Sequence, residues 1–188
     1  MLETNAAVAV CFDAPVVELL TDAELVRHDA LRTLGPELLA PTPDLEEGVL
    51  RLRARDAVPL GEALLDQGVT AGIGNAIKSE ALFVERLDPW TPVHAFSNDE
   101  LHAVLGRAST LLAANTGGGR RVTTGRRAPG EALWVYRRAG RPCRRCGTLI
   151  RARRQGVQAG TTYWCPNCHA ARTRTSPGTR RGGAGPAR

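Results

Sequence analysis

Four cysteines near the end of the chain have the spacing of a metal site. Cys143, Cys146, Cys165 and Cys168 follow the pattern C-x2-C-x18-C-x2-C. Each C-x2-C pair can place two thiolates on a tight turn, and the 18 residues between the pairs suit a hairpin. Four thiolates complete a tetrahedral shell with no open position, so we predict one structural Zn2+ and not a catalytic metal. The alternative is two disulfides, which a reducing cytoplasm disfavours.

Two further candidate ligands fit the site less well. His169 directly follows Cys168, but four thiolates already fill the shell. Cys11 lies far away in a strand-like segment and is expected to be a small buried hydrophobe.

A second candidate site is a glycine-rich turn in front of a predicted helix. Gly72 and Gly74 allow a tight backbone path, Asn75 sits at the helix start, and Lys78 follows one turn later on the same face. The free backbone N–H groups of a helix start attract anions, so the segment predicts a phosphate-binding site. Taken alone, a glycine-rich turn before a helix is weak evidence.

The elements that would position these residues are mostly helical. Sequence signals predict a helix over 45–55 with Asp44 in a capping box, and a second helix from Pro59 to Gly68. A third helix is expected from about Asn75 to Leu87, and a fourth after a capping box at Ser97. Residues 22–40 are expected to be a short helix and a loop.

Strands are expected only near the two ends. Residues 6–20 have the character of two short strands, and because two strands cannot bury both faces, they are expected to be the edge of something larger. The segment Leu133 to Tyr136 is strand-like, the stretch 115–130 is an expected exposed linker, and the tail from Thr173 is expected to be disordered.

The charge is distributed unevenly along the chain. Residues 1–119 carry 8 basic and 18 acidic side chains, whereas residues 120–188 carry 17 arginines and one acid. Such a basic last third predicts a polyanion partner, and Arg153 and Arg154, between the cysteine pairs, are candidates for phosphate contacts. The alternative is a solvated tail in an arginine-biased protein, since 24 arginines accompany one lysine, Lys78.

Together these motifs resemble a family of DNA-repair enzymes. GIGNAIKSEALF resembles the helix-two-turn-helix of the formamidopyrimidine-DNA glycosylase / endonuclease VIII family, and GRPCRRCGTLI with TYWCPNCH resembles its C-terminal zinc finger. The segments CFDAPVVELL and KSEALF are nearer to the endonuclease VIII members, of actinobacterial type, which favour oxidised pyrimidines.

The resemblance covers roughly residues 1 to 170 and implies a mainly α fold. That fold is a helix-two-turn-helix bundle with a small β-remnant at the N-terminus and a C-terminal β-hairpin zinc finger. The implied domains are a remnant of an N-terminal β-sandwich over 1–21, the DNA-binding domain over 22–130 and the zinc finger over 131–172, followed by a tail over 173–188.

The function implied is base-excision repair by a bifunctional DNA glycosylase / AP lyase that removes oxidised bases. The family's nucleophile is the amine of an N-terminal proline, which forms a Schiff base with the sugar. This chain begins Met-Leu-Glu and no residue matches that proline, so we predict no catalytic residue here and no glycosylase step by this chain alone. The DNA-binding residues implied are Gly74, Asn75, Lys78, Arg153 and Arg154.

The zinc finger departs from the family at one position. The family usually has an arginine five residues before the third cysteine, where it reaches a phosphate, and Gly160 stands there in this chain. The resemblance thus leaves open whether DNA affinity is weaker, and whether Arg153 or Arg154 compensates.

Three interpretations follow from the sequence. In the first, the chain is part of a full-length glycosylase whose start is misassigned. In the second it is a non-catalytic zinc-dependent DNA-binding protein, and in the third it is a zinc-ribbon protein that binds protein or RNA. The expected partner is double-stranded DNA with a damaged base or an abasic site, bound by a monomer. No run of about 18 apolar residues exists and no signal peptide is evident, which predicts no membrane association and a cytoplasmic, nucleoid-associated protein.

Overall fold

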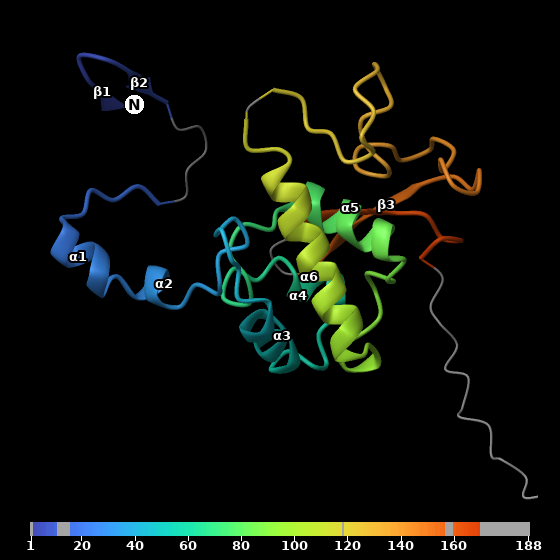
Figure 1. Cartoon of the computed structure of the whole chain (residues 1–188), viewed down its shortest axis with the longest axis horizontal. Helices are drawn as coiled ribbons and strands as arrows, with labels where there is room; N and C mark the ends of the chain where they lie inside the picture. The colour runs from blue at the N-terminus through green and yellow to red at the C-terminus, as the bar shows by residue number, and fades with distance from the viewer. Residues whose placement is uncertain (1, 11–15, 118, 157–159, 170–188) are drawn as a thin grey trace, which may run out of the picture. The chain divides into compact units, whose positions relative to one another are not determined.

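Residues 2–10, 16–117, 119–156 and 160–169 are described by a computed structural model, in which contacts divide the chain into two units, Met1–Leu34 and Gly35–Arg188. Cys11 and the tail from Thr173 lie outside the described residues. Within these ranges the chain is mostly helical with a two-stranded antiparallel hairpin near its C-terminal end (Figure 1).

The first unit contains two very short strands and two short helices. Strand β1 (Leu2–Glu3) pairs antiparallel with β2 (Val8–Ala9), and helices α1 (Asp22–Arg27) and α2 (Asp29–Arg32) follow. The two strands predicted within 6–20 are therefore only partly correct, because β2 lies there and residues 16–20 form no strand. Val16 and Val17 are exposed and lack a partner strand among the described residues, so no ladder stabilises an extended segment at that point.

The three longest helices of the second unit are accompanied by a 3-10 turn. Helices α3 (Leu45–Arg53), α5 (Asn75–Glu85) and α6 (Asn98–Ala113) lie close to their predicted places, and η1 (Val93–Ala95) precedes α6. The capping box at Ser97 is complete, because Ser97 accepts the Glu100 backbone N–H while the Glu100 carboxylate accepts that of Ser97. At Asp44 only half of the predicted box forms, since its side chain accepts the Glu47 N–H.

The helix predicted from Pro59 to Gly68 is much shorter in the structure. Helix α4 spans only Leu60–Ala63, and the chain continues as turns. The Asp66 carboxylate accepts the backbone N–H of Gly68 at 2.8 Å, which offers the backbone an alternative to helical hydrogen bonds.

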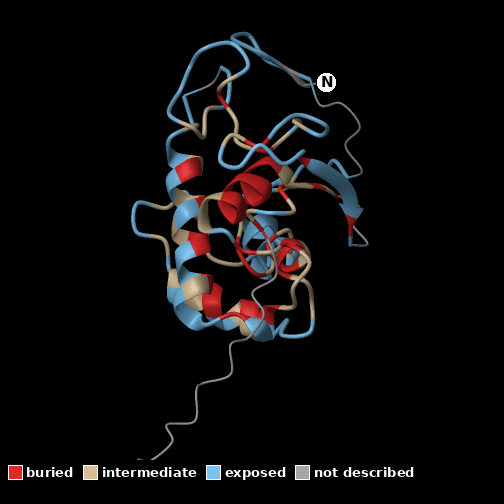
Figure 2. Cartoon of the chain, turned by 90° about the vertical axis from the view of Figure 1, so that its right-hand side faces the viewer, coloured by how far each residue is buried: buried red, intermediate tan, exposed pale blue. Residues whose placement is uncertain are grey.

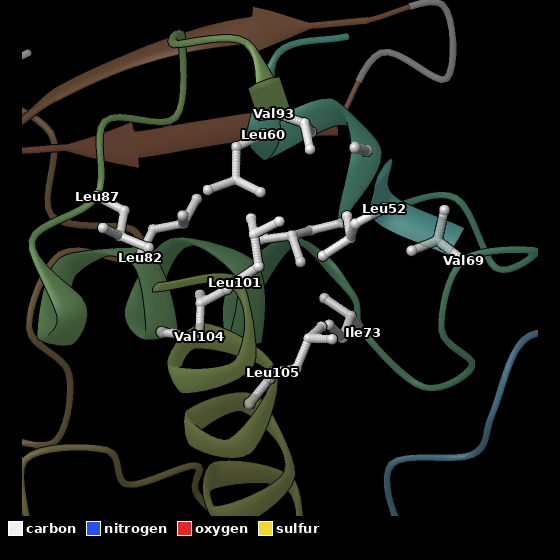
Figure 3. Close-up of a cluster of buried hydrophobic side chains, with 14 of the residues drawn as sticks. Leu52, Leu60, Val69, Ile73, Leu82, Leu87, Val93, Leu101, Val104 and Leu105 are labelled. Atoms are coloured by element: carbon white, nitrogen blue, oxygen red, sulfur yellow. The ribbon is translucent and has the colours of Figure 1, made fainter. Parts of the chain in front are cut away.

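The main core lies between α3, α5 and α6, with α4 and the turns around it. Helix α6 packs against both α3 and α5, and its buried face consists of Leu101, Val104, Leu105, Ala108 and Leu111. Figure 3 shows side chains of this face meeting leucines and valines from the other elements. All residues from Ala76 to Phe83 in α5 are buried, and the helix is correspondingly red in Figure 2. Helix α5 is therefore the central element that carries the predicted Asn75 and Lys78.

The C-terminal hairpin packs against α5. Strands β3 (Arg151–Gln155) and β4 (Gly160–Trp164) pair antiparallel, with Arg153 opposite Thr162. A small second core joins the hairpin to the helix and consists of Phe83, Val135, Cys143, Ile150 and Cys165.

The segment Leu133 to Tyr136 forms no strand, contrary to the prediction. The backbone N–H groups of Trp134, Val135 and Tyr136 donate to the Glu80 carboxylate at 2.7 to 2.8 Å. Because one buried side chain satisfies these three donors, the segment curls around it and pairs with no strand. In the described part of the chain, no helix has the length and apolar character needed to cross a membrane.

Candidate nucleic-acid interface and metal centre

The start of α5 is an uncapped helix end. Gly74 is the N-cap residue, is exposed and supplies no side-chain cap, and the first turn contains no acidic residue. Gly72, just before it, has a φ of 105°, a left-handed backbone conformation that favours glycine, as the tight turn predicted. The first backbone N–H groups of α5 thus have no side-chain acceptor at Gly74 and remain available to an anion.

Asn75 and Lys78 meet at this helix start, but Lys78 is not on the surface. Its side chain is 0% exposed, so the predicted phosphate-binding site contains a covered amine. Lys78 Nζ donates to Asn75 Oδ1 at 3.1 Å and to Thr162 Oγ1 in β4 at 2.8 Å. The hairpin covers the helix face on which Lys78 lies, so the amine contacts Asn75 and the hairpin. Direct contact with DNA stays a prediction.

The electrostatics of Lys78 follow from this burial. Desolvation lowers its pKa from 10.5 to about 8, while the charge of Glu62 opposes the shift. The ammonium form therefore predominates at neutral pH, in a place where keeping the charge is costly.

Gly160 allows the hairpin to approach the helix start closely. It is buried, and an added Cβ would overlap Asn75 Oδ1 and lie 2.8 Å from Leu65 Cδ1. Any side chain at this position would have to displace Asn75. The departure from the family's arginine therefore has a packing reason.

Arg153 and Arg154 point to opposite faces of the hairpin, because they are adjacent in β3. Arg153 shares its face with its cross-strand partner Thr162, and its guanidinium carbon lies 3.8 Å from the ring centroid of Trp90. Arg154 is exposed on the other face. The two candidates cannot both contact one surface lying on a single side of the hairpin.

The four cysteines come together as the spacing predicted. Their sulfur atoms all lie within 4.8 Å of one another. The separations of 3.8 Å between Cys143 and Cys168 and 3.4 to 3.5 Å from Cys146 to Cys165 and Cys168 approach the roughly 3.8 Å that a tetrahedral ZnS4 shell requires. They are far from the length of about 2.05 Å of a disulfide bond. The cluster could hold one metal ion.

The surroundings of the thiols also suit a metal. Hydrogen bonds from Thr148 and Asn167 lower the pKa of Cys146 to about 5, which favours the thiolate. Burial raises the pKa of Cys165 and Cys168, so these thiols need a cation to be ionised at neutral pH. His169 is not in the cluster, since its Nδ1 accepts the backbone N–H of Cys165 at 3.0 Å.

Sequence reasoning missed the residues that join the helix to the hairpin. Glu80 on α5 is 0% exposed and accepts the three N–H groups described above together with the Thr123 hydroxyl. Thr162 and Gln155 are buried as well and hydrogen-bond to each other at 2.6 Å. An acid inside the apolar segment EALF was the one available signal, and it did not reveal partners more than 40 residues away.

Comparisons with known proteins agree with this arrangement. Residues 34–124 match the family model of the formamidopyrimidine-DNA glycosylase H2TH domain. The chain is 44% identical to a probable endonuclease 8 2 of Streptomyces coelicolor over 97% of this chain and 64% of that protein. It is 42% identical to the DNA-(apurinic or apyrimidinic site) lyase Nei2 of Mycolicibacterium smegmatis over 91% of this chain and 66% of that protein. The chain thus spans slightly under two thirds of these relatives.

Solved structures show the same fold. The crystal structure of the MutM (Fpg) protein from Thermus thermophilus is 30% identical, with a TM-score of 0.62 over 77% of this chain and 57% of that one. A complex of the Lactococcus lactis Fpg with abasic-site DNA, at 23% identity, has a TM-score of 0.65 over 80% of this chain and 57% of that one, and shows the fold alone.

The fold and the four-cysteine hairpin define a protein with an Fpg-like fold. With these relatives, the chain belongs to the formamidopyrimidine-DNA glycosylase / endonuclease 8 family.

Proposed function

We propose that this chain is the damaged-DNA-binding part of a base-excision-repair DNA glycosylase / AP lyase that removes oxidised bases. The observation that carries the proposal is the uncapped start of α5, with Asn75 beside it and the four-cysteine hairpin packed against the same helix. The segment from α4 through the turns to α5 is the proposed helix-two-turn-helix. Its partner is duplex DNA containing a damaged base or an abasic site.

The proposed mode of binding uses the backbone and few side chains. The free N–H groups at Gly74 and Asn75 and the Asn75 amide donate to one phosphate of the damaged strand. Arg153 and Arg154 add phosphate contacts from the two faces of the hairpin. These contacts position the duplex and do not read its sequence.

The metal is proposed to be a single structural Zn2+ held by the four cysteines. Four thiolates with no other ligand favour zinc over harder cations and leave no position for a reactant. Bound zinc would stabilise the turns before β3 and after β4, and so hold the hairpin against α5.

Base excision and strand cleavage are proposed for the whole protein, because the chain spans only 64% and 66% of the two relatives described. No described residue is proposed to be catalytic. Lys78, the one lysine, is buried and hydrogen-bonded twice, so it is not placed to attack a sugar. Trapping with borohydride on an abasic-site duplex is expected to give no adduct with this chain, and an adduct at Lys78 would contradict the assignment.

The decisive experiment measures DNA affinity by fluorescence anisotropy. The full chain, loaded with zinc, is titrated against a duplex with an abasic-site analogue, the matching intact duplex and a single-stranded RNA of equal length. Tighter binding to the abasic duplex and a steep loss of affinity with salt are expected. Equal or tighter binding to the RNA would favour the second candidate, a zinc-ribbon module for RNA, which the basic hairpin also suits.

A further inference from the structure

The chemistry of Lys78 distinguishes it from every other basic residue in the chain. It is the single lysine beside 24 arginines, and its side chain is fully buried between α5 and the hairpin. A compact ammonium on a flexible stem fits such a place, whereas a planar guanidinium with five donors requires more space and more acceptors. A lysine is therefore suited to this position by its size and its donor number.

The hydrogen bonds of Lys78 fix the direction of a whole series of side chains. An ammonium only donates, so both Thr162 Oγ1 and Asn75 Oδ1 must be its acceptors. The Thr162 hydroxyl then donates to Gln155 Oε1 at 2.6 Å, and Gln155 Nε2 donates to the carbonyl of Pro89 at 2.7 Å. Each of these hydrogen bonds can therefore run in only one direction, which fixes the orientations of the Thr162 hydroxyl and the Gln155 amide.

The same logic sets the orientation of the Asn75 amide. Because Oδ1 is held by the ammonium, Nδ2 points away from Lys78, at the other end of the same planar amide. Asn75 is half-buried and is the first residue of α5, directly after the exposed Gly74, so its amide lies near the open helix start. Gly160 closes the opposite side, where any Cβ would overlap Oδ1.

We propose that Lys78 is a positioning residue for phosphate binding: it holds the Asn75 amide so that its Nδ2 group, and not its carbonyl oxygen, faces a DNA phosphate. Without the ammonium, Asn75 can rotate and present its carbonyl oxygen, an acceptor that repels a phosphate oxygen. The hairpin takes part through Thr162, which binds the second side of the ammonium and keeps it in place. This inference rests on the proposed DNA binding at the start of α5.

A double-mutant cycle tests the inference. The affinity of the zinc-loaded chain for the abasic-site duplex is measured for Lys78→Met, Asn75→Ala and the double variant. Each single change is expected to weaken binding about tenfold, as for the loss of one phosphate contact. If Lys78 acts through Asn75, the double variant is also about tenfold weaker, whereas independent direct contacts would multiply to about a hundredfold. A hundredfold loss would overturn the proposal.

A second pair of variants separates positioning from stability. Thr162→Ser keeps the acceptor for Lys78 and is expected to bind like the unmodified chain. Thr162→Val removes the acceptor and is expected to weaken binding about threefold under conditions where the zinc content equals that of Thr162→Ser and the variant is fully folded, although its unfolding midpoint falls because Lys78 and Gln155 each lose a buried partner. Equal DNA affinities of Thr162→Val and Thr162→Ser would contradict the proposal that the hairpin keeps the Lys78 ammonium in place.

The outcomes also distinguish this inference from the proposed function. If the unmodified chain does not prefer the abasic duplex, or if Asn75→Ala binds normally, DNA binding at the start of α5 is wrong. If Asn75→Ala weakens binding and Lys78→Met does not, the proposed function stands and the positioning role is wrong. The side-chain amide signal of Asn75 in 15N NMR gives an independent readout, because it should move in Lys78→Met before any DNA is added.

Discussion

Replacing Lys78 by methionine should stabilise the folded chain while weakening its binding to DNA. Lys78 is buried in its charged form, and desolvation is the main cause of its lowered pKa. Methionine is similar in length and apolar, so it removes the buried charge without leaving a large cavity. Thr162 keeps its hydrogen bond to Gln155, and the half-buried Asn75 can turn its oxygen to water.

The magnitude follows from the pKa of Lys78. A decrease from 10.5 to about 8 corresponds to roughly 3 kcal/mol that the folded state loses by keeping the amine charged, at about 1.36 kcal/mol for each pKa unit. The variant also loses the two hydrogen bonds of Nζ, which contribute about 1 kcal/mol each. We therefore expect the free energy of unfolding at pH 7 to rise by about 1 kcal/mol in Lys78→Met.

The dependence on pH gives the sharper test. Between pH 8 and 10.5 the folded chain has released the Lys78 proton while the unfolded chain still binds it. The unfolded state then binds more protons, so the contribution of Lys78 to stability rises with pH across this range. Lys78→Met lacks this contribution, and its advantage should therefore shrink above pH 8.

Urea denaturation followed by tryptophan fluorescence measures the difference. Both proteins are unfolded with saturating zinc at pH 7, 8.5 and 10, and other titrating groups cancel in the comparison because both chains contain them. A variant less stable than the unmodified chain at pH 7, or a difference that does not change with pH, would refute the reasoning.

Three further changes test the close packing of helix and hairpin. Gly160→Arg, which restores the family's arginine, should weaken DNA binding because its Cβ displaces Asn75, whereas Gly117→Ala, with no atom within 4 Å of the added Cβ, should bind normally in the same anisotropy assay. Glu80→Gln should lower the free energy of unfolding by about 2–4 kcal/mol in urea, since an NH2 group would face backbone N–H donors; an unchanged midpoint would contradict its bridging role. Arg154→Ala should reduce the slope of log DNA affinity against log salt concentration by about one, on duplexes of any sequence. An unchanged slope would exclude a phosphate contact.

The features that could be predicted from sequence are those encoded over a few residues. The capping box at Ser97 determines where α6 begins, and the paired C-x2-C motifs bring four sulfurs together. Gly72 and Asn75 mark the start of α5 in the same way, through a local backbone requirement. In each case the physical cause lies within one turn of chain, or in a metal-ligand spacing whose geometry is known.

The features that could not be predicted depend on partners distant in sequence. The strand expected over Leu133 to Tyr136 fails because Glu80, more than 50 residues earlier, accepts its N–H groups. Lys78 was predicted to belong to the phosphate-binding site, and only the packing of β4 against α5 shows that its amine is covered. The sequence shows that Lys78 follows Asn75 by three residues, but it does not show that Thr162 would bind the same amine.

Gly160 and Lys78 together suggest how this chain can bind a phosphate without the arginine that the family resemblance led us to expect. A glycine lets the hairpin approach Asn75 more closely than any side chain would allow, and Thr162 reaches the Lys78 amine. In the proposed binding mode, the buried Lys78 ammonium beneath the helix start holds the Asn75 donors, at the place where the family resemblance implies an arginine at position 160. Such a charge cannot move away from the site, so the donors at Asn75 are arranged before DNA arrives, at the cost in stability that Lys78→Met is expected to reveal.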